Sequence, residues 1–254
     1  MGFIQQIFRW AHIIAGIFWI GHLWFFNFVN TPFQGTIDAD TKKKTNPELL
    51  PRALFWFRWG AAWTWVTGVF LLALIFWHGG ALFDADQSWS LPRIVMVLLV
   101  FVAPFIYDPI AKMEWAKNGQ SMFIAGLILT AIIALLMDYW AHFSYRGFNI
   151  HVGAMFGTIM AYNVWFRIWP AQQKIITGLK QGSPADPAVV AMAGLRSRHN
   201  TFMSVPLVWM MINQHTADSG FASYGDWIPL VVAVAIGWWF VTMFYRQAAK
   251  VPGF

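Results

Sequence analysis

Seven apolar segments, each close to the length that crosses a membrane, dominate this sequence. A transmembrane helix needs about 20 apolar residues, because the hydrocarbon core is ~30 Å thick and a helix rises about 1.5 Å per residue. The segments cover residues 4–30, 54–78, 92–112, 121–142, 150–170, 199–215 and 227–246. They lack the regular alternation of polar residues that a β-barrel requires. We therefore predict an all-α fold, a polytopic integral membrane helical bundle of about seven transmembrane helices.

The composition fits a single membrane domain. Only 11% of the residues are charged and 58% are hydrophobic, whereas about 25% of the residues in a soluble domain are charged. The two longest connections, residues 31–53 and 171–198, are too short to fold alone. We expect residues 1–254 to form one transmembrane domain without a soluble domain. Any chemistry then occurs among the helices or in a partner protein.

Lysine and arginine are concentrated in alternate loops. They are frequent in residues 31–53, 113–120, 171–198 and the C-terminal tail, and rare in 79–91, 143–149 and 216–226. The positive-inside rule places the basic loops in the cytoplasm. We therefore predict a multi-pass protein with its N-terminus outside and its C-terminus in the cytoplasm. This distribution explains the net charge of +6 without a nucleic-acid partner.

Five of the seven histidines fall toward the predicted outer face: His12, His78, His142, His151 and His215. For His78 and His142, the simplest interpretation is an amphipathic anchor at the membrane interface. His12 and His151 differ because each stands inside a strongly apolar run, where polar residues usually face the bundle interior.

Two imidazoles on different helices at one depth are typical of b-type haem ligation. We predict haem b, with His12, His151 and His215 as candidate ligands of the iron. Gly16, Gly153 and Gly157 would let the flat macrocycle approach the backbone. A structural hydrogen bond at each histidine, or a zinc or copper site, remains the alternative.

The stretch RSRHNTFMSVPLVWMMINQH, residues 196–215, has a histidine near each end. Sixteen residues of helix separate His199 from His215 by ~24 Å, so the two cannot share a ligand. We predict that Arg196, Arg198, His199 and Asn200 form an anion-facing group at the start of a helix, where unpaired N–H groups favour an anion. The alternative is that these arginines only follow the positive-inside rule and bind lipid phosphates.

Two other polar residues stand at predicted helix ends. Arg58 opens the second span beside Trp59 and is a further candidate for holding an anion. Asp108 is followed by Pro109 near the end of the third span. We expect Asp108 to be an interfacial residue.

Four motifs together resemble one known family. They are RWAHIIAGIFWIG, FWFRWGAAWTWVTG, HVGAMFGTIMAYNVWFRIWPAQQK and RSRHNTFMSVPLVWMMINQH. In this order they resemble the membrane domain of the bacterial cytochrome c-linked urate oxidases, also called urate hydroxylase or the urate oxidase N-terminal family. The resemblance covers nearly the whole chain. It implies a bacterial inner (plasma) membrane location and oxidation of urate to 5-hydroxyisourate, with electrons passing to cytochrome c.

The resemblance also assigns positions and expected roles. The residues that match the polar pattern of the family are His12, Arg58, Trp59, Asp108, His151, Asn163, Arg196, His199, Asn200 and His215. His199 is then expected to take a proton from urate, while Arg58, Arg196 and Asn200 hold the purine anion. His22, His78 and His142 stand outside this pattern.

The sequence departs from the family in one respect. It has no cysteine, so c-type haem cannot be attached within these residues. We expect a separate cytochrome c to accept the electrons. The alternative function is that of a non-catalytic or electron-conducting accessory subunit of a larger respiratory or photosynthetic membrane complex. A transporter is disfavoured, because no matching pair of broken helices is evident.

Overall fold

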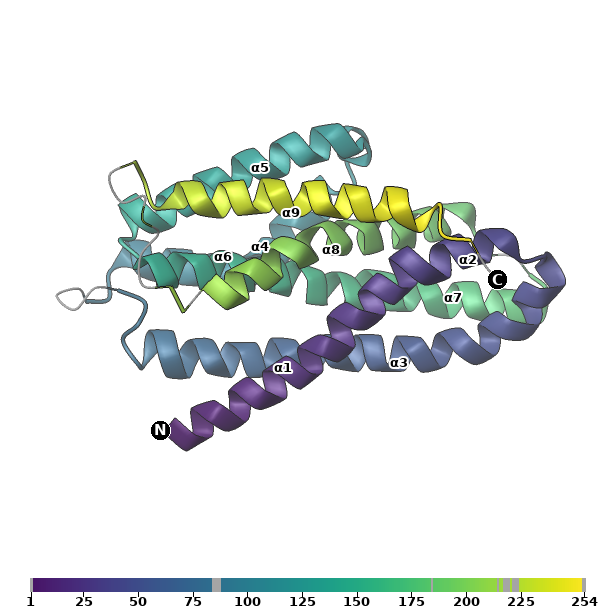
Figure 1. Cartoon of the computed structure of the whole chain (residues 1–254), viewed down its shortest axis with the longest axis horizontal. Coiled ribbons are helices and arrows are strands. Elements are labelled where there is room, and N and C mark those ends of the chain that lie inside the picture. The colour runs from purple at the N-terminus through teal and green to yellow at the C-terminus, as the bar shows by residue number, and fades with distance from the viewer. Residues whose placement is uncertain are drawn as a thin grey trace.

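The computed structural model describes residues 2–83, 88–183, 185–213, 215–216, 220 and 224–252, and within them it contains helices joined by short connections. Figure 1 shows an elongated bundle of helices that run roughly along one direction. The α-helices are α1 Gly2–Trp24, α2 Thr31–Thr36, α3 Ala39–Leu71, α4 Leu91–Ile110, α5 Gly119–Leu135, α6 Tyr145–Asn163, α7 Trp169–Gln181, α8 Pro187–Asn213 and α9 Trp227–Ala248. π-Helical segments extend four of them without a break: Phe25–Asn30, Leu72–Trp77, Leu136–Trp140 and Val164–Ile168. A 3₁₀ turn, Glu114–Lys117, precedes α5.

Within the described residues, five helical rods are long and apolar enough to cross a membrane. They are Gly2–Thr36, Ala39–Trp77, Leu91–Ile110, Gly119–Trp140 and Trp227–Ala248. These rods coincide with five predicted spans, and the prediction of an all-α membrane bundle is confirmed. The count of about seven is not confirmed, because the rods that contain α6 and α8 are less apolar. Most of α6 is buried, and a helix inside a bundle keeps polar residues that meet other protein groups.

The two termini lie at opposite ends of the bundle (Figure 1). The connections α2–α3, α4–α5 and α7–α8 lie at the same end as the C-terminus. Lysines stand at this end in the α4–α5 connection (Lys112 and Lys117), in the first turns of α3 (Lys42, Lys43 and Lys44) and in the last turn of α7 (Lys180). The acidic loop residues Asp84, Asp86 and Asp218 lie outside the described residues. Lysines therefore gather at the end of the folded bundle that carries the C-terminus.

The bundle is tightest where small residues let two helices approach. A Cβ atom at Gly60 would lie 2.9 Å from the backbone nitrogen of Trp19, at the crossing of α1 and α3. A Cβ atom at Gly237 would lie 2.9 Å from the ring of Pro206, where α9 crosses α8. Glycine is required at both crossings, as is typical of helix packing in membranes.

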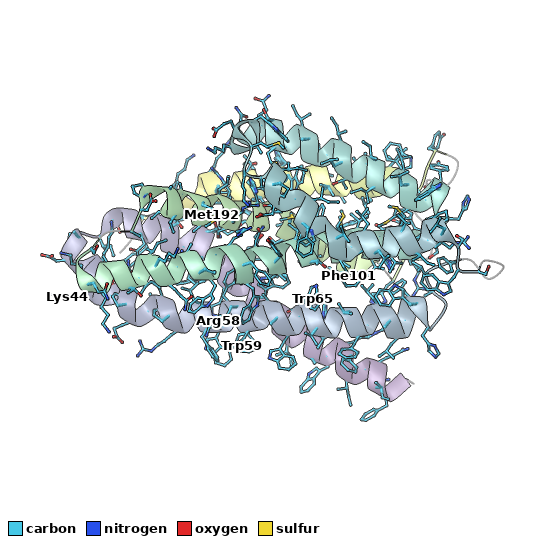
Figure 2. The ribbon with its side chains drawn as sticks, turned by 180° about the vertical axis from the view of Figure 1, so that it is seen from behind. Lys44, Arg58, Trp59, Trp65, Phe101 and Met192 are labelled. Carbon is cyan, nitrogen blue, oxygen red and sulfur yellow. The ribbon has the colours of Figure 1, made fainter. Side chains whose placement is uncertain are left out.

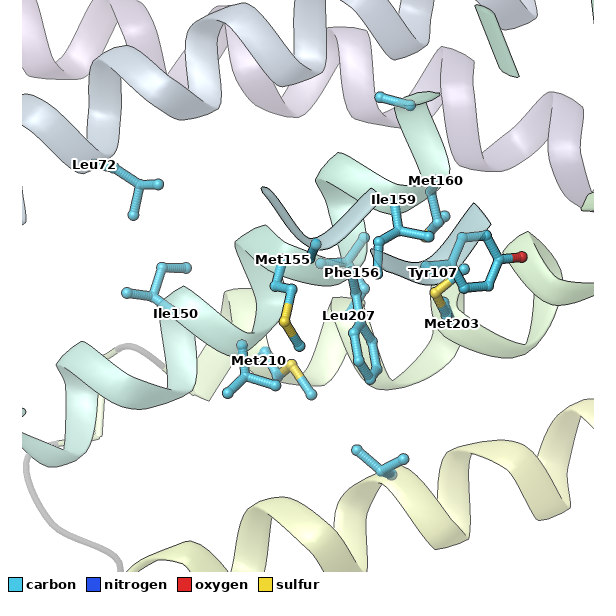
Figure 3. Packing of buried hydrophobic residues seen from close by; sticks show 14 of the residues in the cluster. Leu72, Tyr107, Ile150, Met155, Phe156, Ile159, Met160, Met203, Leu207 and Met210 are labelled. Carbon is cyan, nitrogen blue, oxygen red and sulfur yellow. The ribbon is translucent and has the colours of Figure 1, made fainter. Parts of the chain in front are cut away.

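The centre of the bundle is the interface between α6 and α8. Figure 3 shows Met155, Phe156 and Ile159 of α6 close to Met203, Leu207 and Met210 of α8. In contrast, α4 and α5 make few direct contacts, although a short connection joins them. The space between α4 and α5 leads to one of the two cavities described below.

The start of α3 is fixed by an N-cap outside the membrane-spanning part. The Asp38 carboxylate accepts hydrogen bonds from the Thr41 backbone nitrogen at 2.9 Å and from the Thr41 hydroxyl at 2.8 Å. These hydrogen bonds lower the pKa of the Asp38 carboxyl. The stabilisation by this cap is therefore present above the ordinary aspartate pKa and is lost as the pH falls through the lowered value.

Candidate functional site

Two cavities lie on either side of α6. The first, here called the α5 cavity, measures about 550 Å³ and lies among α4, α5, α6, α8 and α9. The second, the α1 cavity, measures about 680 Å³ and lies among α1, α3, α4, α6 and α8. The α6 side chains Met155 and Phe156 face the first cavity, and Ala154 and Thr158 face the second. The helix is therefore a common wall between two separate chambers.

The two cavities divide α8 between them. The α5 cavity is lined by Leu195, Arg198, His199, Phe202 and Met203. The α1 cavity is lined by Leu207, Val208, Met211 and Ile212, and by His215 just beyond the end of the helix. His199 lines the α5 cavity and His215 lines the α1 cavity. The structure therefore places the two histidines at different chambers, as their spacing in the sequence predicts.

The α5 cavity is apolar except at the end near the α4–α5 connection. Its polar residues there are Tyr107, Lys117, Gln120, Arg198, His199 and Thr242. The Tyr107 hydroxyl lies 2.7 Å from His199 Nδ1. The guanidinium of Arg198 lies 5.2 Å from the centre of the Tyr245 ring, and it has no acidic partner among the described residues. This end of the cavity therefore carries the Arg198 cation, an imidazole, an amide and hydroxyls, together with Lys117, whose ammonium pairs with Glu114 at 2.6 Å.

Asp108 is buried at this level of the bundle and is surrounded by cations. Arg167 binds both carboxylate oxygens, at 2.7 and 2.5 Å. Arg196 Nη2 donates to Asp108 Oδ1 at 2.9 Å, and Lys112 Nζ lies 2.7 Å from Asp108 Oδ2. Asp108 lies in the last turn of α4, which ends at Ile110, as its expected place near a helix end predicts, and its buried carboxylate faces Arg167 and Arg196.

The predicted anion-facing group at a helix start is not formed. α8 begins at Pro187, so Arg196 lies more than two turns inside the helix and gains nothing from its N-terminus. Arg196 is 1% exposed and engaged with Asp108, and Asn200 is 0% exposed. Neither residue lines a cavity. Of the four residues, only Arg198 and His199 face open space.

Arg58 is also remote from this group. Its guanidinium stacks over the Trp169 ring at 3.9 Å, on the side of α3 that faces α7 (Figure 2). Trp59 packs edge-on against Trp165, with 5.4 Å between the ring centres. Arg58 lines neither cavity, so the prediction that it joins His199 in holding one substrate has no support in the fold.

The α1 cavity contains His12 in a defined tautomer. Thr67 uses its hydroxyl hydrogen on the Trp63 carbonyl, 2.6 Å away. The contact of 3.1 Å between Thr67 Oγ1 and His12 Nδ1 therefore has His12 as the donor. The lone pair of His12 is then on Nε2, which makes no hydrogen bond within the described residues. A histidine whose Nδ1–H is held in this way is typical of a metal ligand.

The wall of the α1 cavity leaves space for a flat group. A Cβ atom at Gly157 would meet nothing within 4 Å, and one at Gly16 would meet only the Thr64 methyl at 3.9 Å. Trp65 and Phe101, labelled in Figure 2, also line this cavity and pack edge-on against each other. Together with His12, these features fit a macrocycle bound through an imidazole.

His151 has a different environment from His12. It is 0% exposed and lines neither cavity. Its Nδ1 donates to the Gly147 carbonyl at 2.7 Å, and its Nε2 accepts from Trp77 Nε1 at 3.0 Å. Since both ring nitrogens are engaged, the structure favours the structural hydrogen bond over the role of iron ligand. His22, His78 and His142 line neither cavity.

Sequence reasoning missed three residues of these sites. Tyr107, Arg167 and Thr67 were given no role, although each contacts a residue of the polar pattern of the family. Tyr107 directly precedes Asp108, and that adjacency was the available signal. The zinc or copper alternative has no support, because no three histidine or acidic side chains gather among the described residues.

The comparison with protein families decides the relationship of the chain. The family described as urate oxidase N-terminal matches residues 33–252. The chain belongs to this family. No curated protein and no solved structure matches the chain. The matched range of the urate oxidase N-terminal family begins after α1, and it contains both the His199 end and the His215 end of α8.

Proposed function

We propose that the chain is a membrane oxidoreductase subunit of the urate oxidase type. Urate is oxidised to 5-hydroxyisourate in the α5 cavity, and a separate cytochrome c accepts the electrons. The residues of the α1 cavity would hold haem b, which would supply a one-electron carrier there. The observation that carries this proposal is the pair of cavities with α6 as their common wall: His199 of α8 lines one, and His215, just beyond the end of α8, lines the other. In the reaction, urate and one water give 5-hydroxyisourate, two protons and two electrons.

The polar end of the α5 cavity suits a flat anion. Arg198 presents planar paired N–H donors, and Gln120 supplies both a donor and an acceptor. Lys117 also lines this end, where it pairs with Glu114 at 2.6 Å. The apolar remainder of the cavity, which includes Phe123 and Phe202, would flank the faces of the purine. Urate is an anion near neutral pH, so these cations favour it over a neutral purine.

Haem b fits the α1 cavity through His12, with His215 on the same cavity as the second candidate ligand. When bound, its iron supplies a one-electron acceptor and donor. The chain itself contributes the orientation: Thr67 holds the His12 ring, and Gly16 and Gly157 leave the wall open. His151 is not part of this proposal.

The orientation follows from the basic connections. We place the end that carries the α2–α3, α4–α5 and α7–α8 connections in the cytoplasm of a bacterial plasma membrane, which puts the α1 cavity in the outer half. Reporter fusions after Lys44 and after Trp89 are expected to report cytoplasm and outside, respectively. The opposite result would reverse the route of the electrons.

Removing one histidine at a time separates the two roles. His199→Ala is expected to weaken urate-dependent reduction of added cytochrome c and to leave the haem spectrum unchanged, because it touches only the α5 cavity. His215→Ala is expected to alter the haem spectrum or its reduction. His22→Ala, which lies on neither cavity, is the control and is expected to retain both properties. A wild-type protein that binds haem but ignores urate would favour the accessory-subunit alternative instead.

A further inference from the structure

A chain of hydrogen bonds leads from the core of the bundle to the α5 cavity. Asn200 Nδ2 donates to the Met160 carbonyl at 3.0 Å. Asn163 Nδ2 lies 2.9 Å from Asn200 Oδ1 and 3.3 Å from the Tyr107 hydroxyl. The Tyr107 hydroxyl lies 2.7 Å from His199 Nδ1. These hydrogen bonds connect α8, α6 and α4, and they end at the imidazole of His199.

The direction of each bond is determined from the Met160 end. A carbonyl oxygen only accepts, so Asn200 must present its amide nitrogen to Met160 and its oxygen to Asn163. Asn163 must therefore present its nitrogen, which donates to both Asn200 and the Tyr107 oxygen. No other acceptor for the Tyr107 hydroxyl hydrogen is given by the structure of the described residues. This hydrogen accordingly points to His199 Nδ1.

The hydrogen bond from Tyr107 determines the tautomer of the His199 ring. Because Nδ1 accepts, a neutral His199 carries its proton on Nε2. The Nε2 atom makes no hydrogen bond in the described part of the chain, and it is not among the buried polar atoms that lack a partner. It is therefore accessible, and His199 lines the α5 cavity.

We infer that Asn163 and Tyr107 are positioning residues that fix His199 as a hydrogen-bond donor to the ligand of the α5 cavity. The identity of the ligand rests on the proposed function: the acceptor is a carbonyl oxygen of the urate anion. In this tautomer His199 binds an oxygen and does not take the first proton from urate. The expectation that His199 is the general base is replaced by a role in binding and orientation.

The tautomer is measured directly by nitrogen-15 NMR of protein labelled on histidine, in lipid nanodiscs near neutral pH. The His199 signals are assigned by their loss in His199→Gln. We expect a protonated Nε2 and an unprotonated Nδ1 in the wild type. Tyr107→Phe is expected to shift the Nδ1 signal and to populate the other tautomer, whereas the matched control Tyr162→Phe leaves both signals in place. A wild-type His199 with its proton on Nδ1 overturns the inference, even if Tyr107→Phe fails to fold.

Steady-state kinetics tests whether urate is the ligand that accepts the hydrogen bond of His199. Tyr107→Phe is expected to raise KM for urate about tenfold, with a smaller change in kcat, because the loss concerns one hydrogen bond to an anion. An equal KM in the variant and the wild type contradicts the donor role. If NMR finds the proton on Nε2 but the protein does not turn over urate, the role of Asn163 and Tyr107 in positioning His199 is supported and the proposed function is wrong. The two experiments therefore test the positioning and the proposed function separately.

Discussion

Asp108→Ala is expected to destabilise the protein by about 3–5 kcal/mol, which is much of the stability of a typical domain. The reason is the burial of Arg196, which is 1% exposed and has Asp108 as its only acidic partner among the described residues. Without the carboxylate, its charge is left uncompensated in the bundle, and the charges of Arg167 and Lys112 repel it. Thermal unfolding in detergent and the yield from membranes measure the effect.

An exposed ion pair provides the matched control. Glu48 and Arg52 form a pair whose side chains are 71% and 72% exposed, so Glu48→Gln is expected to cost less than about 1 kcal/mol. The double variant Asp108→Ala with Arg196→Met is expected to recover part of the loss, because both buried charges are then removed. If the Asp108→Ala and Glu48→Gln variants unfold at the same temperature, the ion pairs of Asp108 do not stabilise the protein by this amount.

The helices were predictable because the length of a membrane span is a local property of the sequence. The predicted segment 227–246 corresponds closely to Trp227–Ala248 in the structure. The segment 199–215 was wrong at its start, since α8 begins at Pro187. The preceding residues are less apolar but still form helix, so hydropathy marked the apolar part of the segment and not the length of the helix.

The pairing of the polar residues was not predictable from their positions in the sequence. Asp108 meets Arg167 and Arg196, which are 59 and 88 residues away. His151 and His12 both stand in apolar runs, yet Trp77, 74 residues from His151, takes the nitrogen that a metal would need. Only the three-dimensional arrangement separates the engaged histidine from the available one.

The common depth of the outer histidines was nevertheless informative. His12 and His215 are separated by most of the chain, and both line the α1 cavity. The interior position expected for His12 follows from the cost of a polar group facing lipid. The tautomer could not be predicted, because it depends on Thr67 and on the Trp63 carbonyl across the helix interface.

His12→Ala is expected to remove nearly all bound haem b from the purified protein. The variant removes the Nε2 lone pair that His12 presents to the α1 cavity. Among the described residues of α1, no other histidine lines this cavity. The measurement is the Soret band and the pyridine-haem content per chain, after expression in haem-replete cells. Thr67→Val is expected to weaken haem binding about 10–100-fold, because it removes the oxygen that holds the His12 ring.

Two further variants test whether the effect comes from ligation at this cavity. Gly157→Leu adds a side chain that enters the cavity without meeting protein atoms at its Cβ, so it is expected to exclude the macrocycle while the helices stay folded. His151→Ala removes a histidine that lines no cavity and is expected to retain haem, even though the loss of its hydrogen bond to Trp77 lowers the melting temperature. A wild-type protein without a Soret band, or a His12→Ala protein with full haem content, contradicts ligation by His12. Loss of haem in His151→Ala with the fold intact would instead return that residue to the ligand set, since the hydrogen bonds of both its ring nitrogens would then have to break on haem binding.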